Sequence, residues 1–191
     1  VQGLISDQVM LDHQGWRMLN KTPRGFTAIE MLITISILGI LAALAAPSFK
    51  NLLINAQIRT AAQGLADGLQ FARSEAIRLN QPTVFTKGTQ SSWTVTVVSS
   101  GATLQTRPYT EGSTVATVAT TPSTATKVTF NSLGRVIANA DSSASITRFD
   151  IDAPTSSISA ADSKELRINV TGGGAIRLCD PNGTAGVGMG C

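Results

Sequence analysis

The stretch that decides the fold is Lys21-Thr-Pro-Arg-Gly25-Phe26-Thr-Ala-Ile-Glu30-Met-Leu-Ile-Thr-Ile-Ser-Ile-Leu-Gly-Ile-Leu-Ala-Ala-Leu-Ala-Ala-Pro47-Ser-Phe49. From Met31 to Phe49 it carries no charge. At about 1.5 Å per residue, a helix of this length crosses most of a hydrocarbon core about 30 Å thick. Glu30 lies at the edge of the run, where an unpaired carboxylate that enters lipid costs about 3 kcal/mol. The stretch therefore predicts a membrane helix whose carboxylate needs a partner.

Small residues and a proline in the same run indicate that this helix packs against other helices. Gly39 and the alanines between Ala42 and Ala46 allow a neighbouring helix to approach closely. Pro47 lacks a backbone donor and is expected to loosen or kink the helix near its membrane exit. A plain single-pass anchor is the simpler alternative.

The segment Gly25-Phe26-Thr27-Ala28-Ile29-Glu30 resembles the prepilin peptidase site of type IV pilins and type II secretion pseudopilins. The resemblance implies cleavage between Gly25 and Phe26 and methylation of the new N-terminal Phe26. It also implies that Glu30, the fifth mature residue, pairs with the N-terminus of a neighbouring subunit. An ammonium on Phe26 of one chain would neutralise Glu30 of the next, and such a pair is stronger in a low-dielectric bundle than in water.

The length of 191 residues suits a leader, an anchor and one domain. We expect a leader over 1–25 (with Met10 and Met18 as alternative starts), a transmembrane assembly helix over 26–53 and a head over 54–191. Lys21 and Arg24 before the helix place the leader in the cytoplasm and the head in the periplasm, from which the subunit would be assembled into a pilus at the cell surface. Without 1–25 the side chains total 12 basic and 10 acidic groups, a net charge of +2 (15 minus 3 basic, 12 minus 2 acidic). This near-neutral balance argues against a dedicated nucleic-acid binder.

Cys179 and Cys191 are the chain's two cysteines. In an oxidising periplasm they are expected to form a disulfide, and closing this short glycine-rich loop contributes about 3 kcal/mol to stability. A metal site is the alternative, but it lacks further cysteine or histidine ligands.

The chain after the anchor changes from one helix to many short strands. Apolar residues at spacings of three and four from Asn51 to Leu79 predict an amphipathic helix that continues the membrane helix, spans 54–80 of the head and ends at Asn80-Gln-Pro82. Segments of alternating polarity in 82–191 predict antiparallel strands. These are Thr83–Lys87, Ser92–Val98, Leu104–Tyr109, Lys127–Asn131, Arg135–Ala138, Ile146–Ile151, Leu166–Val170 and Ala175–Cys179. We expect Glu111–Ala125 and Ala138–Ser145 to be loops, and Gly134-Arg135 to form a hairpin turn.

The predicted fold class is therefore α+β, with a long N-terminal helix packed on an antiparallel head, as in type IV pilins. Three stretches resemble the GspH/FimT branch of minor pilins and pseudopilins: Leu69 to Arg78, Phe130 to Val136, and Leu166 to Cys179. The resemblance implies a minor pilin that primes pilus assembly or sits at the tip. Its partners would be other minor and major pilins, prepilin peptidase and the inner-membrane assembly platform. A minor pseudopilin of a type II secretion system is the alternative within the same architecture.

A further alternative is a DNA-binding minor pilin for natural transformation. Some FimT-like proteins bind DNA through a C-terminal Gly-Arg-x-Arg segment, and the corresponding stretch here is Gly174-Ala175-Ile176-Arg177, in which Ala175 replaces the first arginine. Arg177 with Arg167 would make a small phosphate-contacting patch; the simpler interpretation is two solvated strand arginines. We expect no enzyme, cofactor or metal, because the mature chain has no histidine and no nucleophile motif.

Overall fold

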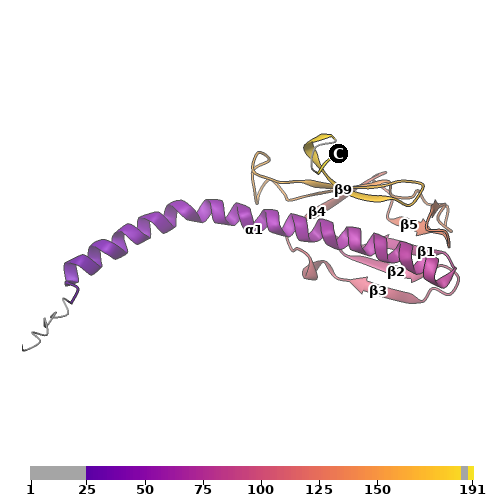
Figure 1. The fold of residues 1–191 in the computed structure, drawn as a ribbon, viewed down its shortest axis with the longest axis horizontal. Coiled ribbons are helices and arrows are strands. Elements are labelled where there is room, and N and C mark those ends of the chain that lie inside the picture. Colours follow the sequence, from indigo (N-terminus) through magenta and orange to yellow (C-terminus); the bar gives the residue numbers. More distant parts are fainter. Residues whose placement is uncertain (1–24, 186–188) are drawn as a thin grey trace, which may run out of the picture. The chain divides into compact units, whose positions relative to one another are not determined.

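The computed structural model describes residues 25–185 and 189–191, so the predicted leader, apart from Gly25, lies outside the described residues. Two compact units divide between Ala42 and Ala43. A single helix, α1, runs over Ala28–Leu79, and one 3-10 turn, η1, over Tyr109–Glu111 (Figure 1). The strands are β1 Thr83–Lys87, β2 Trp93–Val97, β3 Thr103–Arg107, β4 Thr117–Thr121, β5 Lys127–Phe130, β6 Val136–Ile137, β7 Arg148–Asp152, β8 Leu166–Val170 and β9 Ile176–Ala185.

Helix α1 ends where the sequence predicts, through a C-terminal cap built on Asn80. Asn80 has a φ of 51°, the left-handed conformation that asparagine tolerates better than most residues. Its N–H donates to the Ile77 carbonyl at 3.3 Å, and the Gln81 N–H donates to the Ala76 carbonyl at 3.2 Å. These two bonds form a Schellman motif, which satisfies carbonyls that the helix end would leave free.

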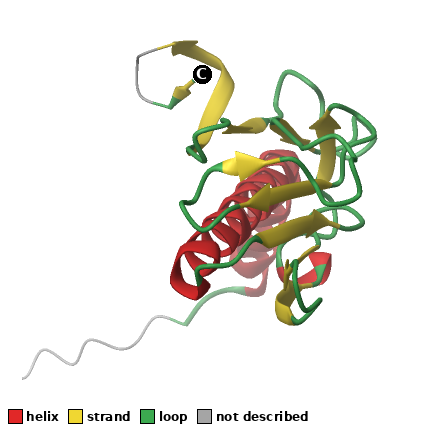
Figure 2. Ribbon diagram, turned by 90° about the vertical axis from the view of Figure 1, so that its right-hand side faces the viewer, coloured by secondary structure: helices red, strands yellow, loops and turns green. Residues whose placement is uncertain are grey.

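The apolar stripe of the second half of α1 is buried, as predicted. Its members share one helix face and are all fully buried: Ile58, Ala62, Leu65, Leu69, Ala72 and Ala76. Figure 2 shows the strands lying around this part of the helix. The head therefore forms its core by covering one side of α1 with sheet.

Two antiparallel sheets provide that cover. The first has the order β3-β2-β1-β5-β6 and the second the order β4-β7-β8-β9. Phe85 of the first sheet meets Phe149 of the second edge-to-face, with ring centroids 6.1 Å apart. Phe130 is fully buried and Trp93 nearly so. The α+β fold class is confirmed.

Two side chains bond the first sheet directly to the helix. Trp93 Nε1 donates to the Gly64 carbonyl at 2.9 Å, and Thr83 Oγ1 donates to the Ala72 carbonyl at 2.7 Å. The indole lies so close to α1 that a Cβ on Gly68 would come within 2.5 Å of it. Both buried polar groups are thus satisfied while the sheet approaches the backbone of the helix.

One loop prediction is wrong, because Glu111–Ala125 contains strand β4. None of the β4 residues is fully buried, and its short Thr-Val-Ala-Thr-Thr sequence shows little apolar alternation. The strand forms because it pairs with β7 along its whole length, from Thr117 opposite Asp152 to Thr121 opposite Arg148. Ala138–Ser145 is mostly irregular, as predicted, and strand β9 continues beyond Cys179 to Ala185.

Candidate functional site

The residues before α1 form a reciprocal cap on the helix start. The Glu30 N–H donates to Thr27 Oγ1 at 3.2 Å, and the Thr27 N–H lies 3.5 Å from Glu30 Oε2. This Thr-x-x-Glu arrangement is a capping box, and its carboxylate also faces the positive end of the helix dipole. Glu30 therefore has a local role in its own chain, which the sequence analysis missed although the spacing was visible there.

Gly25 and Phe26 precede the cap and are exposed. The Phe26 side chain is 75% exposed. A Cβ placed on Gly25 would meet no atom within 4 Å among the described residues. The folded chain therefore imposes no steric need for glycine at position 25.

The N-terminal half of α1 is apolar on all sides and uncovered. Its most apolar window has a mean hydropathy of 2.3, and none of that window is buried within the described residues. Leu44 is 73% exposed and Ile29 62%. The hydroxyls of Thr34 and Ser36 donate to the carbonyls of Met31 and Leu32 in the preceding turn, which satisfies their donors without water. By length and composition the segment is able to cross a membrane.

Arg167 and Arg177 share the outer face of the second sheet. In the pairing of β8 with β9, Arg167 lies opposite Cys179 and Asn169 opposite Arg177, so both arginines project from the face opposite Ile168. Arg167 Nε donates to Asp150 Oδ1 at 2.6 Å, and Arg148 Nε donates to Asp150 Oδ2 at 2.8 Å. Arg177 is exposed and forms no ion pair within the described part of the chain.

Arg148 and Asp150 are thus members of this surface that the sequence analysis did not assign. The signal was present as Arg148-Phe-Asp150, two charged residues on one face of a strand, but the pairing with Arg167 depends on register. The four side chains carry three positive charges and one negative charge, a net +2. The Asp150 carboxylate is therefore paired with two of the three guanidinium groups.

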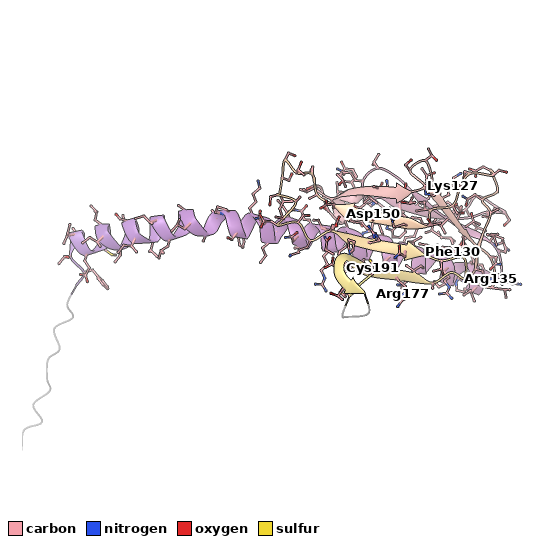
Figure 3. The ribbon with its side chains drawn as sticks, turned by 90° about the horizontal axis from the view of Figure 1, so that it is seen from above. Lys127, Phe130, Arg135, Asp150, Arg177 and Cys191 are labelled. Atoms are coloured by element: carbon pink, nitrogen blue, oxygen red, sulfur yellow. A yellow bond between two sulfur atoms is a disulfide. The ribbon has the colours of Figure 1, made fainter. Side chains whose placement is uncertain are left out.

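A disulfide joins Cys179 to Cys191 and fixes the C-terminus beside β9. The Asp180 N–H donates to the Met189 carbonyl at 2.6 Å, and the Cys191 N–H donates to the Asp180 carbonyl at 3.1 Å. Figure 3 shows Arg177 beside the C-terminal segment that carries Cys191. A hollow of about 460 Å³ lies between them, lined also by Asn169 and Met189.

Two glycine turns that belong to the sequence motifs meet at the C-terminal end of α1. Gly134 and Gly174 have φ values of 73° and 82°. A Cβ on Gly174 would lie 1.8 Å from the Gly134 carbonyl oxygen, and one on Gly134 would lie 2.9 Å from Arg73 Nε. The Val136 N–H donates to the Gly172 carbonyl at 3.1 Å, which joins the two sheets. These motif glycines therefore have a packing role, and Gly134-Arg135 closes the predicted hairpin.

Comparison with known proteins decides the family. The model of the family described as "Type II transport protein GspH" matches residues 61–186. The chain belongs to the GspH family. In this GspH-family protein, residues 20–46 also match the prokaryotic N-terminal methylation motif. The family resemblance drawn from the sequence is confirmed, whereas the roles of the individual site residues stay predictions.

Two curated relatives match a part of this GspH-family protein. A fimbrial protein of Moraxella nonliquefaciens is 49% identical over 47 residues, which are 25% of this chain and 30% of the relative. The fimbrial protein EcpC of Eikenella corrodens is 43% identical over 58 residues, which are 30% of this chain and 37% of the relative. The matches thus span about a third of these relatives.

Solved structures of the type IV minor pilin FimU of Pseudomonas aeruginosa, in space groups P21 and P65, resemble the GspH-family chain. Each aligns with a TM-score of 0.45 and 18% identity over 63% of this chain, and over 87% and 90% of the respective FimU chains. Within residues 25–185 and 189–191, no cluster of three or more histidine, cysteine or acidic side chains is placed to hold a metal.

Proposed function

We propose that this protein is a minor pilin of a type IV pilus, a structural subunit that primes pilus assembly or sits at the pilus tip. The observation that carries the proposal is the uncovered apolar helix headed by Gly25, Phe26 and Glu30. Such a helix needs lipid before assembly and other apolar helices afterwards. The methylation motif and the two fimbrial relatives support the same function.

Processing would separate a leader over 1–25 from a mature chain that begins at Phe26. Residues 26–53 would hold the subunit in the inner membrane, and the head over 54–191 would lie in the periplasm until the pilus extends from the surface. Gly25 has open space around it, so a peptidase requirement accounts better for a glycine there than packing does. The partners would be major and minor pilins, prepilin peptidase and the inner-membrane assembly platform.

Glu30 would have two successive roles in this scheme. Before assembly its carboxylate caps α1 through Thr27. During assembly the second role is an ion pair with the ammonium of a neighbouring subunit's N-terminus, which the low dielectric of a helix bundle strengthens. The two roles differ in what they need, because capping requires an acceptor oxygen and pairing requires a negative charge.

Two variants separate these roles in a strain that lacks the gene. Glu30→Gln keeps an acceptor for the cap and removes the charge, whereas Thr27→Ala keeps the charge and weakens the cap by about 1 kcal/mol. We expect the deletion to reduce the count of sheared surface pili. Wild type and Thr27→Ala should restore that count, and Glu30→Gln should not, although immunoblots show it cleaved and in the membrane.

Equal restoration by Glu30→Gln would refute the ion pair. An unchanged pilus count in the deletion strain would refute the assembly function itself.

A minor pseudopilin of a type II secretion system is the second candidate, favoured by the match to a family of type II transport proteins. Measurement of secreted protein in the same deletion strain separates the two functions. Normal pili with lost secretion would support the pseudopilin, and lost pili with normal secretion would support the pilin.

A further inference from the structure

The outer edge of β9 is a free strand edge. β9 lies at the end of its sheet, and among the described residues its first part, Ile176 to Cys179, pairs with β8 alone. The hairpin bond from the Thr171 N–H to the Ala175 carbonyl, 3.0 Å long, sets which residues face β8. Because the direction of backbone groups alternates along a strand, residues 177 and 179 face β8 in the same way as Ala175. The N–H and carbonyl groups of Ile176, Leu178 and Asp180 therefore point away from the sheet.

The chain's own C-terminus confirms this direction at Asp180. Both outward groups of Asp180 are taken by the tail, through Met189 and Cys191, in a parallel bridge. The disulfide from Cys191 to Cys179 holds the tail in place. This edge therefore already accepts one extended segment, and within the described residues no backbone group bonds the outward side of Ile176 or Leu178.

Hollows flank the free edge on the side of α1. One of about 390 Å³ lies between α1 and the end of the sheet, with Leu166, Leu178 and Met189 as its apolar lining. A second of about 340 Å³ lies further along α1, lined by Ile77 and Ile176. A segment added to the edge would thus find apolar sites beside it for its side chains.

The charge of the surface around the two hollows indicates which kind of extended segment would bind at the β9 edge. Arg59 and Lys164 line the larger hollow and Arg73 the smaller one, and none of them forms an ion pair within residues 25–185 and 189–191. The Nε of Arg73 is buried and has no hydrogen-bond partner there. Asp180 is the one carboxylate among the residues that line the two hollows, so the surface carries a net charge of +2.

We propose that the edge of β9 at Ile176 and Leu178 binds an extended acidic segment of a neighbouring pilin-family subunit by strand addition. Backbone hydrogen bonds to the edge would fix the register of the segment. Its acidic side chains would pair with Arg59, Arg73 and Lys164, and its apolar side chains would enter the two hollows. The inference rests on the proposed pilin function, since that function supplies the neighbour.

The test places a photo-crosslinking amino acid at Leu178 of the full-length protein in piliated cells. We expect a light-dependent adduct with a pilin-family subunit, mapped by mass spectrometry to an extended, net acidic segment. Combining Arg59→Glu with Lys164→Glu should lower the yield about fivefold, as expected for the loss of two exposed ion pairs. Arg107→Glu, on the edge strand β3 of the other sheet, is the matched control and should leave the yield unchanged.

The same crosslinker at Leu38 in the apolar helix distinguishes a failure of the strand addition from a failure of the proposed pilin function. Adducts with pilins from Leu38 but none from Leu178 overturn the strand addition and leave the pilin function standing. Pilin adducts from neither position overturn both. An adduct from Leu178 to DNA, to a helix, or to a second copy through a basic segment also overturns the inference.

Leu178→Pro provides a measurement that needs no crosslinker. The outward N–H of Leu178 makes no bond to β8, so proline removes no hydrogen bond of the sheet. It also replaces an apolar side chain that packs against the core, and Leu178→Ala is the control for that loss. We expect the protein to keep its disulfide and to be incorporated into pili less efficiently. Unchanged incorporation of this variant would contradict the proposal.

Discussion

Individual residues in this protein satisfy backbone groups at both ends of α1. Thr27 and Glu30 cap the start reciprocally, and Asn80 ends the helix in the left-handed conformation. Gly134 and Gly174 lie in turns where the backbone has a positive φ and where the two turns approach each other closely. A single atom at such positions has a large effect, because backbone atoms have little room to move away.

Gly174→Ala tests the contact between the turns. We expect it to lower the free energy of unfolding by about 2–4 kcal/mol, since left-handed strain adds to a clash with the Gly134 carbonyl. Gly101→Ala is the matched control: Gly101 has a φ of 68° but open space around it, so only the strain of about 1–2 kcal/mol applies. Urea unfolding followed by the fluorescence of Trp93, the one tryptophan after residue 25, measures both. Equal losses would show that the turns do not press together.

At the scale of elements, the irregular segment after β6 is held by polar bonds rather than apolar burial. Asn139 is buried and bonds to Thr129, Ser143 and Ala144, while Asp141 pairs with Lys127 of β5. The hydrogen bond from Lys127 and those from Ser143 hold the pKa of the Asp141 carboxyl well below its usual range. Asp141 therefore adds to the stability of the loop while its carboxylate is ionised, beside the bonds that Asn139 makes at any charge.

Asp141→Asn tests that pH dependence. A carboxyl with a lowered folded pKa stabilises the protein above its unfolded pKa, about 3.9 for aspartate, and this contribution is lost as the pH falls through the folded value. We expect the variant to melt about 1–3 °C lower at pH 7, as for an exposed ion pair, and the difference to shrink as the pH falls below about 4. In a Lys127→Met background most of the effect should disappear. A deficit that stays constant with pH would refute the role of the charge.

At the scale of the whole molecule, the head presents three arginines, Arg148, Arg167 and Arg177, on a sheet face that also carries a carboxylate. Asp150 accepts from both Arg148 and Arg167, so only Arg177 of this group stays free for phosphate. Each phosphate contact adds little affinity and weakens with salt. The structure therefore favours a subunit-facing or solvated surface over a duplex-binding one.

Fluorescence anisotropy with labelled duplex DNA and the detergent-solubilised protein tests whether this sheet face binds DNA. We expect no saturable binding at about 150 mM salt, and at low salt only weak binding that falls with log salt with a slope near −1 to −2. Asp150→Asn, which frees two arginines, should strengthen the low-salt binding, and Arg177→Ala should abolish it. Tight binding by the wild type that depends on Arg177 would instead support a role in DNA uptake.

Features that depend on neighbours along the chain follow from the sequence alone. The apolar run before Pro47, the three-and-four spacing of the second half of α1 and the stop at Asn80 are all local patterns, and most strands follow from alternation over a few residues. The segment from Gly25 to Glu30, which lies within the matched N-terminal methylation motif, was likewise recognisable because its residues are contiguous in sequence.

Features that depend on register and on sheet order become visible in the folded chain. Strand β4 exists because β7 pairs with it, and Asp150 reaches Arg167 because β7 and β8 align at those residues. The free edge of β9 and the flanking cations Arg59 and Lys164 come together from segments about a hundred residues apart. Local periodicity carries no information on such pairings, since one residue of slip would reverse every face.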